Sequence, residues 1–175
     1  MLFPPSPILP PIGNGIRNLE IVTINHTTAG ADKTVFLTTP VKTENFLVLA
    51  VQREHKDKYT LIKPEAIVDG EFTRLRSEQD SADGVHDIQC TVCEFLGAKS
   101  INYYSPLIAN PASNKTTTIT AVDTSKSVII PLGGFIDGGV SPQNEILTFD
   151  NSTTVRHDVS SALDVELGFC VLELH

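Results

Sequence analysis

Apolar and polar residues alternate along most of this chain in short segments, and the spacing of apolar residues typical of helices is nearly absent. The alternation is clearest over residues 116–122 and 165–171, as expected for strands that bury one face. The segments are rich in Val, Ile, Thr and Phe, and clusters of Asn, Asp, Gly and Pro separate them. This pattern predicts an all-β fold. It argues against an α/β fold, because no helical period lies between the strands.

The expected strands fall into two groups separated near residue 97. In the first group they cover residues 19–25, 34–39, 46–52, 59–62 continuing as 65–68, 72–76 and 85–95. In the second group they cover residues 100–109, 116–122, 128–132, 145–149, 153–157 and 165–174. Loops are expected at the charged residues 53–58, at residues 77–84 and at the Gly-rich residues 133–139, with a tight hairpin turn at Asp69-Gly70.

The two groups repeat one another about 80 residues apart, which indicates a tandem architecture. The segments that match are 41–49 with 122–130, 65–67 with 145–147, 73–76 with 153–156, and 85–95 with 165–174. The prediction is two tandem antiparallel β-sandwich modules, jelly-roll-like, at residues 17–97 and 98–175. Modules of this size bury a marginal core alone, so we expect them to lean on each other or on neighbouring subunits.

Residues 1–16 precede the first module and are predicted to form an extended Pro-rich arm. They hold five of the eleven prolines, which prevents both a continuous helix and a central strand. One interpretation is a floppy tail. The other is an arm that docks on its own module or on a partner, because its apolar side chains are many for a solvated tail. The candidate docking residues are Phe3, Pro4, Pro5, Ile8, Leu9, Pro10 and Ile12.

Composition and charge exclude some partners. A net charge of -8 and a pI near 5.0 disfavour nucleic-acid binding, which uses clustered Lys and Arg. No apolar run reaches the roughly 18 residues that a membrane-spanning helix needs, so no membrane association is predicted. The apolar N-terminus has no cationic start and is broken by prolines, so it does not resemble a secretory signal.

Three cysteines, an odd number in a chain of this length, do not form a disulfide framework of the small secreted type. Cys90 and Cys93 look like a CxxC motif, but they lie in an expected strand, where residues three apart point to opposite faces. They are therefore interpreted as core residues. A second hypothesis, prompted by the odd count, is an intersubunit disulfide through an outward-facing Cys90, Cys93 or Cys170.

No pattern of catalytic or metal-binding residues emerges from the sequence. The five histidines are scattered at positions 26, 55, 86, 157 and 175, and no pair has the helical spacing of zinc ligands. No nucleophile elbow is visible, and the glycines of residues 133–139 lack the Lys-Ser/Thr of a phosphate-binding loop. We therefore predict a protein without enzymatic activity, cofactor or metal.

The second module resembles one that recurs in structural proteins of tailed bacteriophages. The resemblance is carried by residues 122–129, by residues 147–156 and by the closing residues 171–174. It covers residues 98–174 well and residues 17–96 more loosely. It implies a virion structural protein of the capsid decoration, collar or fibre type, made in the host cytoplasm and assembled as a homo-oligomer. A trimer is favoured by the same analogy, with the arm bound to another virion protein.

A carbohydrate-binding module for adhesion to the host surface is the alternative function. Lectin-like sites favour exposed aromatic rings, yet aromatic residues make up 6% of this chain and tryptophan is absent. Tyr103-Tyr104 is the only adjacent aromatic pair. Because neighbours on a strand point to opposite faces, we expect this pair to divide between the core and an interface.

Overall fold

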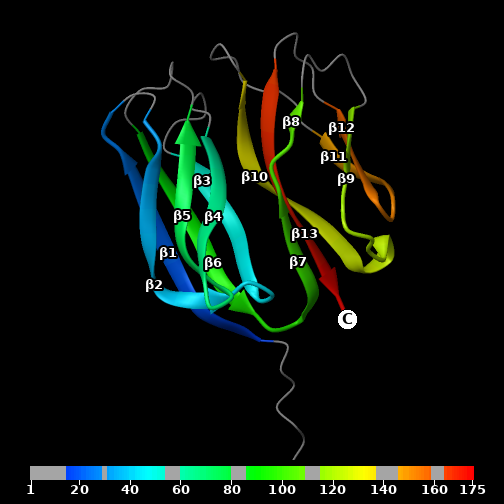
Figure 1. Cartoon of the computed structure of the whole chain (residues 1–175), viewed down its shortest axis with the longest axis horizontal. Coiled ribbons are helices and arrows are strands. Elements are labelled where there is room, and N and C mark those ends of the chain that lie inside the picture. The colour runs from blue at the N-terminus through cyan, green and yellow to red at the C-terminus, as the bar shows by residue number, and fades with distance from the viewer. Residues whose placement is uncertain are drawn as a thin grey trace, which may run out of the picture.

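The computed structural model describes residues 15–28, 31–53, 60–79, 86–108, 115–136, 146–158 and 164–175, and these form an all-β fold (Figure 1). The first half holds β1 (Ile16–His26), β2 (Lys33–Lys42), β3 (Phe46–Arg53), β4 (Thr60–Val68), β5 (Glu71–Gln79) and β6 (His86–Phe95). The second half holds β7 (Ala98–Tyr104), β8 (Leu107–Ile108), β9 (Lys115–Thr118), the 3-10 turn η1 (Thr124–Lys126), β10 (Ser127–Ile136), β11 (Ile146–Asn151), β12 (Thr154–Asp158) and β13 (Val165–Leu174).

The strands pair in antiparallel sheets, as the alternating pattern predicts. A 3-stranded sheet has the order β1-β6-β3, and another has the order β11-β12-β9. The third sheet is 7-stranded and has the order β2-β5-β4-β10-β13-β7, with β8 paired to β13. This sheet takes strands from both halves, because β4 of the first half pairs with β10 of the second at Leu61 and Gly133. Figure 1 shows β7, β10 and β13 between the first half and the sheet of β9, β11 and β12.

Strand order is the same in the two halves. The orders β1-β6-β3 and β2-β5-β4 in the first half correspond to β7-β13-β10 and β9-β12-β11 in the second. Register is repeated as well, since Phe46 faces Glu94 and Val48 faces Val92, while Ser127 faces Glu173 and Ile129 faces Val171. These are the residues that the repeat in the sequence aligned. The match of residues 65–67 with residues 145–147 was wrong, because Lys63 and Thr148 face the equivalent residues Arg76 and Arg156, so Leu147 corresponds to Ile62.

The main core is shared between the halves. It joins buried residues of the first half, among them Phe46, Leu47, Ile62, Leu75, Ile88 and Cys93, to Ile101, Leu132, Cys170 and Leu172 of the second. A separate cluster within the second half packs Ile119, Val122 and Val155 against Phe169 and Val171. Because one core crosses the boundary, the halves are expected to unfold together.

Several strand predictions were wrong in extent. The strand predicted over residues 100–109 is interrupted at Ser105 and Pro106, between β7 and β8, and residues 77–79, predicted to be loop, continue β5. The strand predicted over residues 116–122 ends at Thr118, although Ile119 and Val122 remain buried and donate backbone hydrogen bonds to Thr153 and Ser152. The Gly-rich residues 133–136 were predicted to be loop but continue β10. Gly133 has a φ of 100° beside a shift in the register, and a Cβ on Gly134 would lie 2.6 Å from the carbonyl oxygen of Glu166. These glycines therefore permit close strand pairing.

Candidate functional site

The junction between the two halves gathers the most unusual polar and steric features among the described residues. At its centre, Leu61 of β4 is fully buried and lies over Gly168 of β13. A Cβ at Gly168 would overlap Leu61 Cδ1, and it would lie 3.4 Å from Cβ of Leu132. Because position 168 has no side chain, Leu61 of the first half can approach β13 of the second half closely.

Tyr103 of β7 ties the second half to the free edge of β3. Its hydroxyl donates a hydrogen bond to the carbonyl oxygen of Phe46 at 2.9 Å and accepts one from the backbone N–H of Val48 at 3.2 Å. The ring packs against Phe46 and Phe72, with ring centroids 6.2 and 5.9 Å away. Burial raises the pKa of Tyr103, so this hydroxyl stays neutral and keeps both hydrogen bonds over the whole ordinary pH range. Two backbone groups at the edge of β3 are satisfied in this way.

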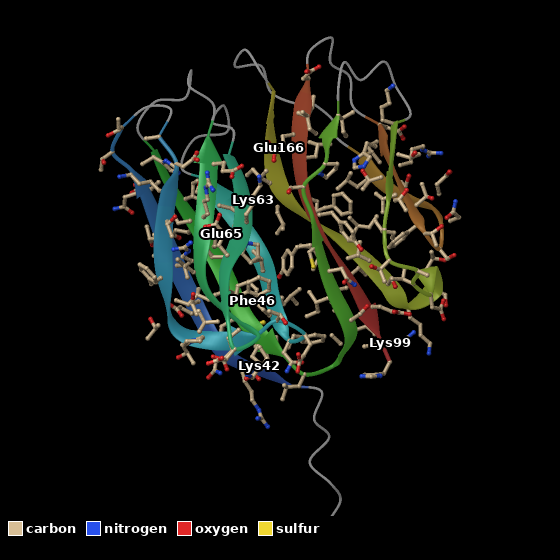
Figure 2. All side chains as sticks on the ribbon, viewed as in Figure 1. Lys42, Phe46, Lys63, Glu65, Lys99 and Glu166 are labelled. Carbon is tan, nitrogen blue, oxygen red and sulfur yellow. The ribbon has the colours of Figure 1, made fainter. Side chains whose placement is uncertain are left out.

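Lys63 of β4 forms an ion pair with each half. Its Nζ lies 2.5 Å from Oε2 of Glu78 on β5 and 2.7 Å from Oε1 of Glu166 on β13. Figure 2 shows Lys63 and Glu166 facing one another across the boundary between the halves. Burial opposes the charged form of Lys63, but the hydrogen bonds with Glu166 and Glu78 outweigh it and raise the pKa. The ammonium therefore links the halves electrostatically as well as through packing.

A second carboxylate, Glu173 of β13, organises the far end of the second half. Its side chain is almost fully buried, and it accepts hydrogen bonds from Lys99 Nζ at 2.8 Å and from the backbone N–H of Asp123 at 2.9 Å. The hydrogen bond from Lys99, followed by that from Asp123, lowers the pKa of Glu173. Since these contacts join β13 to the turn before η1, Glu173 has a structural role.

Two hollows lie along β7, and neither combines groups suited to catalysis. One, of about 220 Å³, is lined by Ile62, Lys63, Pro64, Tyr103, Tyr104, Ser105 and Leu132. The other, of about 470 Å³, is lined by Thr43, Glu44, Phe72, Lys99, Ser100, Ile101, Asn102 and Tyr103. Lys63 and Tyr103 are already engaged in the contacts described above, and no nucleophile is paired with a base in either hollow.

The two tyrosines divide as the strand pattern predicted. Tyr103 lies at the junction, whereas Tyr104 stacks on Phe169 in the core of the second half, with ring centroids 5.2 Å apart. The Tyr104 hydroxyl accepts a hydrogen bond from the backbone N–H of Thr120 at 2.9 Å. Neither ring is presented flat to solvent in the way that a sugar-stacking platform requires.

All three cysteines are buried, and none of them forms a disulfide with another described residue. Cys90 and Cys93 both belong to the shared core, in agreement with the interpretation of core cysteines, and Cys170 lies beside the Tyr103 hydroxyl. Burial raises the pKa of Cys93, and it raises the pKa of Cys170 to about 12. No thiol reaches the surface in the outward-facing position that an intersubunit disulfide needs, so a bond through Cys90, Cys93 or Cys170 would require the sheets to open.

The two buried histidines are structural. His26 lies between Ser77 Oγ at 2.8 Å and the carbonyl oxygen of Ala31 at 3.1 Å. His157 is bonded through Nε2 to Thr117 Oγ1 at 2.7 Å and packs edge-on against Phe169. Burial lowers the pKa of His157, so the ring is neutral near pH 7. The described residues contain no cluster of three or more metal-ligating side chains.

The predicted docking arm cannot be placed. Of residues 1–16, only Gly15 and Ile16 belong to the described residues, and Phe3, Pro4, Pro5, Ile8, Leu9, Pro10 and Ile12 lie outside them. The charged residues 54–58 and residues 137–139 of the Gly-rich segment also lie outside. Among the residues that are described, no helix is long and apolar enough to cross a membrane.

Sequence reasoning missed the junction, although it contained two signals. Gly168 interrupts an otherwise aliphatic strand, which indicates close approach of another backbone or side chain. Lys63 is a charged residue within an expected strand, between two apolar stretches. Only the pairing of β4 with β10 brings these positions together.

Comparisons with protein-family models, with characterised proteins and with solved structures found no match. The function therefore has to be argued from the geometry of the chain itself.

Proposed function

We propose that this chain is a non-enzymatic structural protein of a virion, of the capsid decoration, collar or fibre type, which assembles as a homo-oligomer. The observation that carries the proposal is the junction: two halves of equal strand order are fused through one core and one sheet. Lys63 and Tyr103, whose side chains could otherwise take part in catalysis, form an ion pair and a hydrogen bond that hold the two halves together. A rigid block of this kind suits a protein that presents surface.

The finer architecture belongs to this proposal. We infer two jelly-roll-like sandwiches, at residues 17–97 and 98–175, derived from one ancestral unit. In each half the first strand pairs with the last, and β2 pairs with β5 as β9 pairs with β12, which is how a jelly roll is wound. Each half then contributes two 3-stranded layers, and the shared core adds the burial that a module of this size lacks alone.

The Pro-rich arm is proposed to bind another virion protein. The carbonyl oxygen of Gly15 accepts a hydrogen bond from the backbone N–H of Leu96 at 3.1 Å, so the end of the arm is fixed to the connection between β6 and β7. Residues 1–14 thus start from a defined point. Prolines restrict an extended segment before it binds, which lowers the entropy cost of docking its apolar side chains.

Deletion of residues 1–14 tests this proposal. The truncated protein is expected to keep the far-UV spectrum and thermal midpoint of the full chain but to be missing from purified particles. A full-length variant with Ile8→Ser and Leu9→Ser separates loss of apolar contacts from loss of length, and it should be incorporated poorly. Normal incorporation of the truncated protein would refute docking through the arm. Absence of the full-length protein from particles would refute the virion role.

The geometry favours this structural role over the carbohydrate-binding alternative. Tyr103 and Tyr104, the adjacent aromatic pair, are held by ring packing and by hydrogen bonds to backbone groups within the chain. A sugar would have to displace these contacts before it could stack on either ring.

A further inference from the structure

Positions in the two halves can be matched through the register of their central strands. Val92 of β6 and Val171 of β13 occupy the same place, since they face Val48 and Ile129. One residue earlier on each central strand, Thr91 faces Ile21 and Cys170 faces Tyr103. Ile21 of β1 is therefore the counterpart of Tyr103 of β7, and by the same alternation Leu19 is the counterpart of Ile101.

The counterparts differ sharply in exposure. Ile101 is 8% exposed, because it and Tyr103 pack on the first half at the junction. Leu19 and Ile21 are 62% and 68% exposed. At Leu19 and Ile21 the first half thus exposes apolar side chains whose counterparts Ile101 and Tyr103 pack at the junction.

The opposite surface of the junction is also present twice. Leu61 of β4 faces Glu78, and Ile146 of β11 faces Asp158. These two acidic residues are counterparts, since Arg76 and Arg156, two positions earlier, face Thr34 and Thr116. Leu61 is fully buried in the junction, whereas its counterpart Ile146 is 54% exposed. The strand edge that the first half buries in the junction, at Leu61, is therefore exposed in the second half, at Ile146.

The strands that carry this second pair of surfaces, β11 and β1, are sheet edges. β4 pairs with β10 within the chain, but its counterpart β11 stands at the end of a 3-stranded order, as does β1. An edge strand with an exposed apolar side chain favours pairing with another chain.

We propose that a second copy of this chain binds head to tail, with the β11 edge of one copy, led by Ile146, against the outer face of β1 and β6 of the next, at Leu19 and Ile21. This inference rests on the homo-oligomeric assembly proposed above and supplies its interface. The contact between copies repeats the contact within the copy. Because the two surfaces are different, the interface is heterologous, and successive copies close into a ring if the rotation between them permits.

The contact between copies is expected to be weaker than the junction within the chain. Gln89 stands at the position of Gly168, so Ile146 cannot sit as deeply as Leu61 does. Thr148 and Asp87 stand at the positions of Lys63 and Glu166, so the ion pair across the junction is not repeated. Assembly should therefore depend on protein concentration.

Two single substitutions on the purified full-length protein test the proposal. Ile21→Asp spoils one surface and Ile146→Asp spoils the other, and both side chains are exposed enough that folding should be unaffected. Each variant is expected to weaken association about tenfold or more in sedimentation velocity, by placing a charge in an apolar contact. Phe36→Asp is the matched control, since Phe36 is 70% exposed on β2 outside both surfaces. It should assemble as the wild type does.

An equimolar mixture of the two variants gives the sharpest result. Each retains one intact surface, so a head-to-tail interface predicts a heterodimer and nothing larger. Failure of the mixture to form any complex, while the wild type assembles, would overturn the proposal. So would a wild type that stays monomeric at every concentration. Since these measurements need no particle, they can succeed or fail independently of incorporation into a virion.

Discussion

A methyl group at position 168 should disrupt the junction between the halves. In Gly168→Ala, the new Cβ overlaps Cδ1 of Leu61, which is fully buried and cannot move aside without shifting its neighbours. Overpacking of this kind costs about 1–3 kcal/mol. The lower entropy of the unfolded alanine chain offsets only about 0.4–1 kcal/mol of it. Gly168→Ala is therefore expected to lower the free energy of unfolding.

The penalty should vanish when Leu61 is shortened. Leu61→Ala alone is expected to cost about 2–5 kcal/mol through lost burial and a residual cavity. In that background, the nearest remaining neighbour of a Cβ at position 168 is Cβ of Leu132, at a distance of 3.4 Å, which is an ordinary contact. The added methyl then fills space, so the double variant should be no less stable than Leu61→Ala. The predicted coupling energy is about 1–3 kcal/mol.

Urea denaturation of the four proteins, followed by circular dichroism and by tyrosine fluorescence, measures this coupling. The shared core predicts one transition that coincides for both probes. Gly15→Ala is the control, because nothing lies within 4 Å of a Cβ at that position, and its effect should stay within about 0.5 kcal/mol. Additive effects of the two substitutions, within about 0.5 kcal/mol, would refute the contact between Leu61 and Gly168.

Three further predictions concern buried polar groups. Tyr103→Phe should lower the free energy of unfolding by about 1–3 kcal/mol, because it leaves the buried backbone groups of Phe46 and Val48 unpaired. Tyr104→Phe should lower it less, since water can replace the exposed hydrogen bond between the Tyr104 hydroxyl and Thr120. Equal losses for the two variants would contradict this prediction. The free energy of unfolding in urea should fall as the pH drops below about 6.5, because histidine binds a proton more readily in the unfolded chain than at the buried position 157, where its pKa is lowered. His157→Gln should make the free energy of unfolding depend less on pH. An unchanged slope would exclude His157 as the source of the pH dependence. The three thiols should react with a disulfide reagent only as fast as the protein unfolds, and immediate reaction under native conditions would show that a cysteine is exposed.

The strands could be predicted because their physical cause is local. Alternation decides which residues can line one face, and the β-branched residues of segments such as 165–174 favour extended backbone. The failures were also local in origin. Gly133 and Gly134 lack any side chain that could show alternation, so they were assigned to a loop, whereas close pairing with β13 makes them part of a strand.

The sequence by itself determined the all-β class and the approximate positions of most strands, and its repeat aligned residues that the structure places at equal register, such as Glu94 and Glu173. Only the tertiary structure decided how the halves meet. Lys63 and Glu166 are far apart along the chain, and nothing in either segment specifies the other as its partner. Likewise, the register of the strands makes Leu61 and Ile146 equivalent, yet one is buried and the other exposed. That difference arises because Leu61 packs against Gly168 of the other half, whereas no described residue covers Ile146 in the same way.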